Sequence, residues 1–106
     1  MAKFLIRGSY TAEGAKGLIK EGASGRKAAV QKALESLGGK LDSFYYMFGA
    51  DDVIVICDMP DTISGLALSM AVNASGAVRI STTPLLSVED VDAACKKAVS
   101  YRPAGS

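Results

Sequence analysis

Apolar and polar residues alternate along four short segments of the chain, and alternation with a period of two is typical of half-buried β-strands. Between these segments, apolar residues recur three and four positions apart, which is typical of amphipathic helices. These periodicities predict strands at residues 3–10, 40–48, 52–58 and 77–83, and helices at about residues 11–21, 24–37, 60–74 and 87–97. The order is β-α-β-β-α-β with an extra C-terminal helix. It predicts an α+β fold of the ferredoxin-like type, in which an antiparallel four-stranded sheet carries two helices on one face.

Turn and cap residues mark the ends of the predicted elements. Thr11 and Ser24 offer side-chain oxygens that cap the first two helical segments, and Gly38-Gly39 suits the left-handed end of the second. Gly49-Ala50-Asp51 predicts a short hairpin turn between the second and third strands. In the helix that follows, the periodicity places five apolar residues on one side: Ile63, Leu66, Ala67, Met70 and Ala74.

Both faces of the predicted sheet are rich in apolar residues. In the strand at residues 40–48, strict alternation puts Leu41, Ser43, Tyr45 and Met47 on one face and Asp42, Phe44, Tyr46 and Phe48 on the other. Residues 53–57 are apolar on both sides. Two helices cover only one face of a sheet, so we expect a homo-oligomer assembled through the second face. A bound ligand is the alternative cover, and the aromatic residues between positions 44 and 48 serve either packing or a binding site.

The composition is typical of a compact, ordered domain. The 106 residues are 49% hydrophobic and carry a net charge of +1, which fits one domain over residues 1–106 and excludes a disordered chain. No apolar run is long enough to span a bilayer, and Lys3 and Arg7 interrupt any signal-peptide core. We therefore expect no membrane partner.

Histidine and tryptophan are absent, and the lack of histidine removes several reaction classes. Ser-His-Asp and Cys-His catalysis, His-ligated zinc and His-ligated haem are all excluded. Cys57 and Cys95 form no CxxC motif and cannot build a zinc site alone. We interpret them as free, partly buried thiols of a cytoplasmic protein, with a disulfide or a reactive thiol as the alternatives. We expect no metal and no cofactor.

Several segments, in the order and spacing found here, resemble the GYD-domain family. They are Gly8-Ser9-Tyr10-Thr11-Ala12-Glu13-Gly14, the stretch from Ser43-Phe44-Tyr45-Tyr46 through Gly49 to Asp52-Val53, Asn73-Ala74-Ser75-Gly76-Ala77-Val78-Arg79, and the trailing Lys96-Lys97-Ala98-Val99 with Tyr101-Arg102. The resemblance covers nearly the whole chain. It implies a bacterial, dimeric α/β-barrel relative of the ferredoxin-like fold and leaves the activity open. The Gly-x-Tyr-Asp signature of the family reads Gly49-Ala50-Asp51-Asp52 here, so Asp51 replaces its tyrosine.

Polar side chains near strand ends are the candidate site residues. Asp52 follows the glycine turn, where it either caps backbone N–H groups or acts as a site acid, and Asp51 points to the opposite face of a strand. Tyr10 ends the first strand, beside a helix N-terminus. Arg79 on the fourth strand either pairs with an aspartate or holds a substrate carboxylate. The candidates for catalysis are Tyr10, Tyr46 and Asp52, and those for ligand binding are Tyr10, Tyr45, Tyr46, Asp52 and Arg79.

Charge is distributed unevenly along the chain. Residues 1–40 carry eight basic and three acidic side chains, whereas residues 41–95 carry one basic and eight acidic. The overall balance lacks the basicity of a nucleic-acid-binding domain, so no nucleic-acid partner is expected. Lys20, Arg26 and Lys27 either form a solvated helix face or bind an anion at a subunit cleft.

These patterns support three functional hypotheses. The leading one is a small cytoplasmic homo-oligomeric protein that binds a small molecule or serves as an assembly module, without strong catalysis. The second is a cofactor-independent enzyme, similar to monooxygenases or isomerases, with a tyrosine as proton donor and an aspartate as base in a pocket between sheet and helices. The third is a sensor of an anion or a nucleotide at a subunit cleft.

Overall fold

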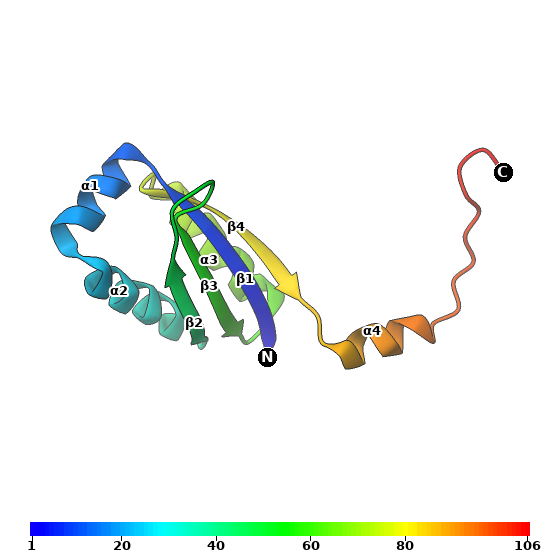
Figure 1. The fold of residues 1–106 in the computed structure, drawn as a ribbon. Coiled ribbons are helices and arrows are strands. Elements are labelled where there is room, and N and C mark those ends of the chain that lie inside the picture. The colour runs from blue at the N-terminus through cyan, green and yellow to red at the C-terminus, as the bar shows by residue number, and fades with distance from the viewer.

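A computed structural model of the chain describes all residues from Met1 to Ser106 (Figure 1). Four strands and four helices follow one another along the chain. The strands are β1 (Ala2–Tyr10), β2 (Lys40–Tyr46), β3 (Val53–Met59) and β4 (Val78–Leu85), and the helices are α1 (Ala12–Glu21), α2 (Ala23–Ser36), α3 (Thr62–Ala74) and α4 (Val88–Cys95). The protein is an α+β domain, as the periodicities predict.

The four strands form one antiparallel sheet in the order β2-β3-β1-β4. This order suits the ferredoxin-like plan, in which a helical crossover leads to each edge strand. The first crossover is divided into α1 and α2 because Gly22, with a φ of 90°, breaks it. Gly22 also occupies the N-cap of α2, so the cap predicted at Ser24 is wrong by two residues.

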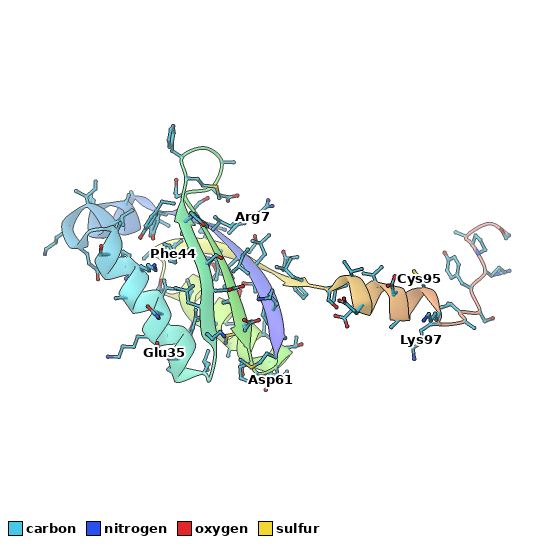
Figure 2. All side chains as sticks on the ribbon, turned by 60° about the horizontal axis from the view of Figure 1, so that its bottom comes forward. Arg7, Glu35, Phe44, Asp61, Cys95 and Lys97 are labelled. Atoms are coloured by element: carbon cyan, nitrogen blue, oxygen red, sulfur yellow. The ribbon has the colours of Figure 1, made fainter.

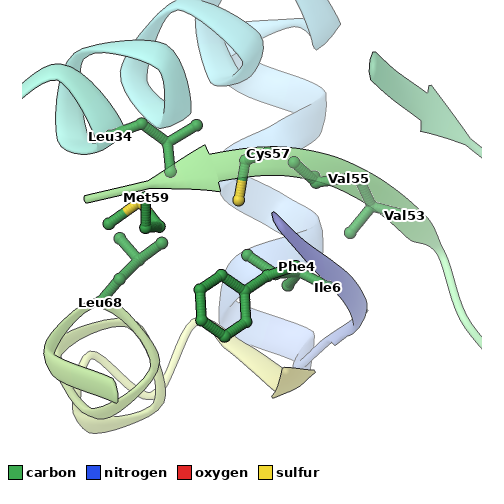
Figure 3. Packing of buried hydrophobic residues seen from close by; sticks show 8 residues of the cluster. All are labelled: Phe4, Ile6, Leu34, Val53, Val55, Cys57, Met59 and Leu68. Atoms are coloured by element: carbon green, nitrogen blue, oxygen red, sulfur yellow. The ribbon is translucent and has the colours of Figure 1, made fainter. Parts of the chain in front are cut away.

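The core lies between the sheet and the helices α2 and α3. Alternate residues of β1 and β3 are buried, and Leu34 and Leu68 cover them from the two helices (Figure 3). In α3, a Cβ at Gly65 would meet the ring of Phe4 at 2.7 Å. The absence of a side chain at Gly65 therefore lets α3 lie close to the sheet. The buried cluster comprises Phe4, Ile6, Leu34, Val53, Val55, Cys57, Met59 and Leu68.

A β-bulge in β2 overturns the strict alternation expected for this strand. The pairing with β3 shifts after Leu41, so Leu41 shares the helix-covered face with Phe44 and Tyr46, while Asp42 lies on the opposite face. The predicted faces of Leu41 and Asp42 are wrong for this reason. The strand also ends at Tyr46, and residues 47–52 form a longer loop in place of the predicted three-residue turn.

The apolar stripe that the sequence pattern marks on α3 faces outward. Ile63, Leu66 and Met70 are exposed, whereas Gly65 and Leu68 are the buried residues of this helix. The helix contains no charged residue, and apolar residues lie on both its inner and its outer side. Periodicity alone does not identify the inner side of such a helix.

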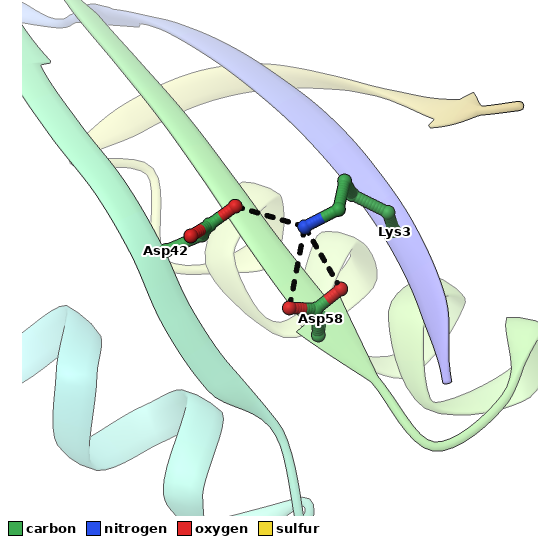
Figure 4. Close-up of polar contacts among 3 residues, drawn as sticks. All are labelled: Lys3, Asp42 and Asp58. Carbon is green, nitrogen blue, oxygen red and sulfur yellow. Dashed lines mark hydrogen bonds and ion pairs between the residues drawn. The ribbon is translucent and has the colours of Figure 1, made fainter. Parts of the chain in front are cut away.

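The face of the sheet opposite the helices, called here the open face, is uncovered. Lys3 reaches two carboxylates on it: its Nζ atom lies 2.8 Å from Asp42 Oδ2 and 3.1 Å from Asp58 Oδ1 (Figure 4). The hydrogen bond from Lys3 to Asp42, and to a smaller extent the one to Asp58, raises the pKa of Lys3. The same bond to Lys3 lowers the pKa of Asp42. Beside this ion-pair cluster, the open face carries the apolar residues Leu5, Tyr45, Ile54 and Ile56.

Residues 86–106, called here the C-terminal arm, extend away from the rest of the chain, which we call the body (Figure 1). The molecule measures 56 × 33 × 22 Å, and its radius of gyration of 16.9 Å exceeds the ~13 Å of a compact chain of similar length. No residue of α4 is buried. None of the four helices combines the length and the apolarity that crossing a membrane requires.

The two cysteines are free thiols in different environments. Cys57 is buried in the core, and burial raises its pKa to about 11. Cys95, at the end of α4, is exposed. The expectation of partial burial is therefore wrong for both residues, because Cys57 faces the helices and Cys95 lies on the arm.

Candidate functional site

Three of the candidate residues line one pocket beside α1. Tyr10 comes from β1, Tyr46 from β2 and Asp52 from the loop before β3, and the pocket that they line has a volume of about 510 Å³. The rest of its lining is apolar and consists of Ala15, Leu18, Ile19, Ala23 and Met47. We call this site the tyrosine pocket. The structure thus brings together the three residues that the sequence names as candidates for catalysis.

Asp52 is fixed by hydrogen bonds to the end of β1. Its Oδ2 atom accepts a hydrogen bond of 2.8 Å from the backbone N–H of Tyr10, and its own N–H donates to the carbonyl oxygen of Gly8 at 2.8 Å. The backbone N–H of Met47 donates to the carbonyl oxygen of Asp52, also at 2.8 Å. Asp52 therefore ties the β2–β3 loop to β1, and one carboxylate oxygen, Oδ1, has no hydrogen-bond partner within the protein.

Tyr46 carries a phenol that is held in place from two sides. Its hydroxyl group donates a hydrogen bond of 3.0 Å to the carbonyl oxygen of Ala23, and its ring meets that of Phe44 edge-on, with centroids 5.1 Å apart. Burial raises the pKa of Tyr46, and the neighbouring Tyr10 raises it further. The phenol is therefore protonated at neutral pH and offers an uncharged polar group to the pocket.

Asp51 and Asp52 do not form a like-charge pair. The Oδ1 atom of Asp51 accepts a hydrogen bond of 3.3 Å from the hydroxyl group of Ser9, whereas Asp52 bonds to the backbone of Tyr10. The carboxylate that stands in place of the signature tyrosine thus holds the loop to Ser9 and lies outside the tyrosine pocket. Nowhere in the chain do three or more His, Cys, Asp or Glu side chains gather in an arrangement that could hold a metal ion.

Tyr45 and Arg79, the other two ligand-binding candidates, lie elsewhere. Tyr45 projects from the open face and is 68% exposed. Arg79 pairs across the sheet with Ser9 and lines a separate shallow pocket next to Thr11 and Asn73. It forms no ion pair with an aspartate. Both side chains are separated from the tyrosine pocket because each strand alternates its residues between the two faces of the sheet.

The basic residues of α1 and α2 do not converge on one anion site. The guanidinium of Arg26 lies 3.5 Å from the carboxylate of Glu21, so part of its charge is balanced locally. Lys20 and Lys27 are exposed and line none of the pockets that Arg26 lines. Arg26 instead stands at a smaller cavity of about 110 Å³ between the sheet, α2 and α3, which Tyr10 also lines.

The apolar wall that α1 gives to the tyrosine pocket is not among the features predicted from the sequence. Leu18 and Ile19 line it, and Ile19 is largely exposed because the pocket is open to solvent. The signal in the sequence was the cluster of apolar residues on one side of a short helix that starts directly after Tyr10. Gly14 and Gly17 interrupt this cluster and weaken the pattern of the helix.

A comparison with models of known families matches most of the chain. The matching family is described as the GYD domain, and the match covers residues 4–95, which include the whole tyrosine pocket. No curated protein and no solved structure matches the chain. The family resemblance identified in the sequence is confirmed.

Proposed function

The chain belongs to the GYD domain family, and on this premise we propose that it binds a small, largely apolar molecule in the tyrosine pocket, as a cytoplasmic homo-oligomer assembled through the open face. The observation that carries the proposal is the convergence of Tyr10, Tyr46 and Asp52 on one apolar pocket of about 510 Å³. Small-molecule sites commonly have volumes of about 300–1,000 Å³ and combine an apolar lining with a few polar groups. The exposed free thiol of Cys95 suits a reducing cytoplasm.

The lining favours a ligand with an uncharged polar end. Leu18 and Ile19 offer an apolar wall, the protonated phenol of Tyr46 offers a hydrogen bond, and Asp52 offers an acceptor. Because the phenol hydrogen of Tyr46 is donated to the carbonyl oxygen of Ala23, a ligand hydroxyl would donate to Asp52, and an amide NH2 group could donate to both Asp52 and the Tyr46 oxygen. An anionic group would be repelled by the carboxylate of Asp52.

Binding of 2-naphthol, an apolar ring system with one hydroxyl group, tests this proposal. We expect saturable binding by fluorescence titration, and weaker binding of 2-naphthoate, which carries an anion on the same rings. Ala15→Trp fills the pocket and should abolish binding, whereas Ala28→Trp on the exposed side of α2 should leave it unchanged. Equal binding by both variants would contradict the proposed site.

The open face supports the assembly part of the proposal. A sheet with helices on one side leaves its other side uncovered, and contiguous exposed apolar surface is typical of interfaces. Leu5, Ile54 and Ile56, each partly exposed, lie next to one another at its centre. Two open faces packed together would give the dimeric α/β barrel that the family resemblance implies.

Sedimentation velocity tests the sheet-face assembly. Ile56→Lys places a charge at the centre of the open face and should shift the protein towards monomer. Thr83→Lys, at the edge strand of the same face, is the matched control and should shift it much less. A wild-type protein that is monomeric at micromolar concentration would contradict this part of the proposal.

Catalysis in the same pocket is the second candidate function, favoured by the protonated phenol of Tyr46 near a carboxylate. A proton donor and an acceptor in one apolar pocket suit general acid–base chemistry. Exchange of the C1 hydrogen of bound 2-naphthol for deuterium in D2O, followed by mass spectrometry and lost in Asp52→Asn, would support it, because the carboxylate takes up one proton as the ring accepts another. Binding without accelerated exchange would leave ligand binding as the function.

A further inference from the structure

The smaller cavity between the sheet, α2 and α3, called here the inner cavity, is almost entirely apolar. It has a volume of about 110 Å³, and all but one of the 13 residues that line it are hydrophobic. The helix α2 contributes Ala29 and Ala33, where larger side chains would occupy the space, and Phe44 of β2 lies on the side of the sheet that α2 covers (Figure 2). The exception among the lining residues is Arg26.

A second space, between α1, α2 and α3, adjoins the inner cavity and is called here the entrance. It has a volume of about 400 Å³, and its charged residues are Arg26 and the exposed Glu13 and Glu21. The two spaces share six lining residues, which are Tyr10, Arg26, Ala33, Leu68, Val72 and Val78. An apolar cavity is therefore reached through an entrance that carries both signs of charge.

Arg26 stands where the inner cavity and the entrance meet, and most of its hydrogen-bonding capacity is unused. Its side chain is 33% exposed, and its one contact with an acidic group joins Nη1 to Glu21 Oε1 at 3.5 Å. A guanidinium group has five N–H donors, and a carboxylate can accept from two of them side by side. Arg26 can therefore hold the carboxylate of a ligand in addition to its contact with Glu21.

The volume of the inner cavity limits the apolar part of a ligand. In another protein, an apolar cavity of about 150 Å³ binds benzene, which has six carbon atoms. In proportion, the 110 Å³ of the inner cavity hold a group of about four carbon atoms. This is the size of a branched aliphatic side chain such as that of free leucine.

We propose that the inner cavity binds the side chain of a free α-amino acid of about the size of leucine, whose charged main-chain groups remain in the entrance. Arg26 binds the carboxylate, and Glu13 and Glu21 attract the ammonium group. A zwitterion suits this entrance best, because two glutamates repel an anionic ligand and Arg26 repels a cationic one. The site contains neither Tyr46 nor Asp52, so it stands independently of the proposed function.

Calorimetric titration of the full-length protein with four small molecules tests the ligand class. We expect saturable binding of L-leucine. The compounds 4-methylpentanoate, which lacks the ammonium group, and 3-methylbutylamine, which lacks the carboxylate, should each bind about tenfold more weakly or worse, because each loses a charged contact. L-tryptophan should be weakened as much, because its side chain exceeds the cavity. Absence of leucine binding, or equal binding of any of the other three molecules, would overturn the proposal.

Two substitutions in α2 test the position of the ligand. Ala33→Leu fills the inner cavity and should weaken leucine binding about tenfold or more, whereas Ala28→Leu on the exposed side of α2 should leave it unchanged. Denaturant unfolding reports that both variants stay folded. Equal binding by the two variants would overturn the proposal.

Arg26→Gln tests the carboxylate contact by a change of selectivity. It should weaken leucine binding about tenfold and should not weaken the binding of 3-methylbutylamine, which has no carboxylate to lose. Unchanged leucine binding, or an equal loss for both molecules, would overturn the proposal.

The tyrosine pocket provides the last control. Ala15→Trp, which fills that pocket, should leave leucine binding unchanged, and Ala33→Leu should leave the binding of 2-naphthol unchanged. Failure of one site is therefore distinguishable from failure of the other. Loss of leucine binding in Ala15→Trp would place leucine in the tyrosine pocket and overturn the proposal.

Discussion

The body and the C-terminal arm are held in place by different means. In the body, alternate residues of β1 and β3 meet Leu34 and Leu68 in one buried cluster. In the arm, α4 buries no residue and relies on the capping contacts of Ser87 and Asp90. Local signals thus define where a helix starts, whereas burial decides where it lies. The arm has the local signal that starts its helix, but it has no burial against its own chain.

The largest difference between the two regions should appear on truncation of apolar side chains. Leu34 is fully buried between α2 and the sheet. Leu34→Ala should lower the free energy of unfolding by about 2–5 kcal/mol, because it leaves a cavity in the core. Val99→Ala in the arm should change it by less than ~0.5 kcal/mol. Denaturant unfolding measures both, and equal losses would contradict the division into body and arm.

Two glycines of α1 provide a sharper test of how the body is packed. A Cβ at Gly14 would overlap the backbone carbonyl of Ala77, whereas a Cβ at Gly17 meets nothing within 4 Å. Gly14→Ala should therefore destabilise the protein by about 1–3 kcal/mol, since α1 must move away from the start of β4. Gly17→Ala should stabilise it by about 0.5–1 kcal/mol through helix propensity. Thermal unfolding of both variants should give shifts of opposite sign, and shifts of the same sign would argue against the close contact of α1 with Ala77.

Substitutions of Asp52 distinguish the effect of its hydrogen bond to Tyr10 from the effect of its charge. Its bond to the backbone N–H of Tyr10 joins the β2–β3 loop to β1. Asp52→Ala should lower the free energy of unfolding by about 1.5 kcal/mol, the low end for a hydrogen bond to a charged group, because the residue is partly exposed. Asp52→Asn keeps an acceptor oxygen and should cost less. Equal losses would show that the charge, rather than the hydrogen bond, ties the loop to β1.

The elements of the body were predictable because their signals are local. The side chains of Thr11, Asp61 and Ser87 cap helices where the sequence indicates that they begin. The bulge after Leu41 was not predictable, because it depends on how β2 pairs with β3. The inner side of α3 was not predictable either, because no charged residue marks the outer one.

The three residues of the tyrosine pocket were predictable as candidates, whereas the separation of Tyr45 and Arg79 from them was not. Tyr10, Tyr46 and Asp52 are polar side chains at strand ends or on the sheet. Tyr45 was grouped with them although it is adjacent to Tyr46, and adjacent residues of a strand face opposite sides. Arg79 lies apart from the pocket because its pairing with Ser9 of β1 sets the face that it occupies.

The smallest predicted effect concerns the ion pair that joins β1 to β2 across the open face. Lys3 lowers the pKa of Asp42 below its ordinary value of 3.8, mainly through their hydrogen bond of 2.8 Å. A carboxylate with a lowered pKa stabilises the folded state above about pH 4, and this contribution is lost as the pH falls through the lowered pKa. Asp42→Asn should therefore lower the melting temperature slightly at neutral pH, and this difference should shrink as the pH falls through the lowered pKa of Asp42. Asp92→Asn, in the arm and without an ion pair, should have no effect at neutral or low pH. If the melting temperature of Asp42→Asn stayed equally far below that of the wild type at low pH, the ion pair with Lys3 would not be the cause. The geometry of the bulge, rather than the charge of Asp42, would then hold β2 to the body.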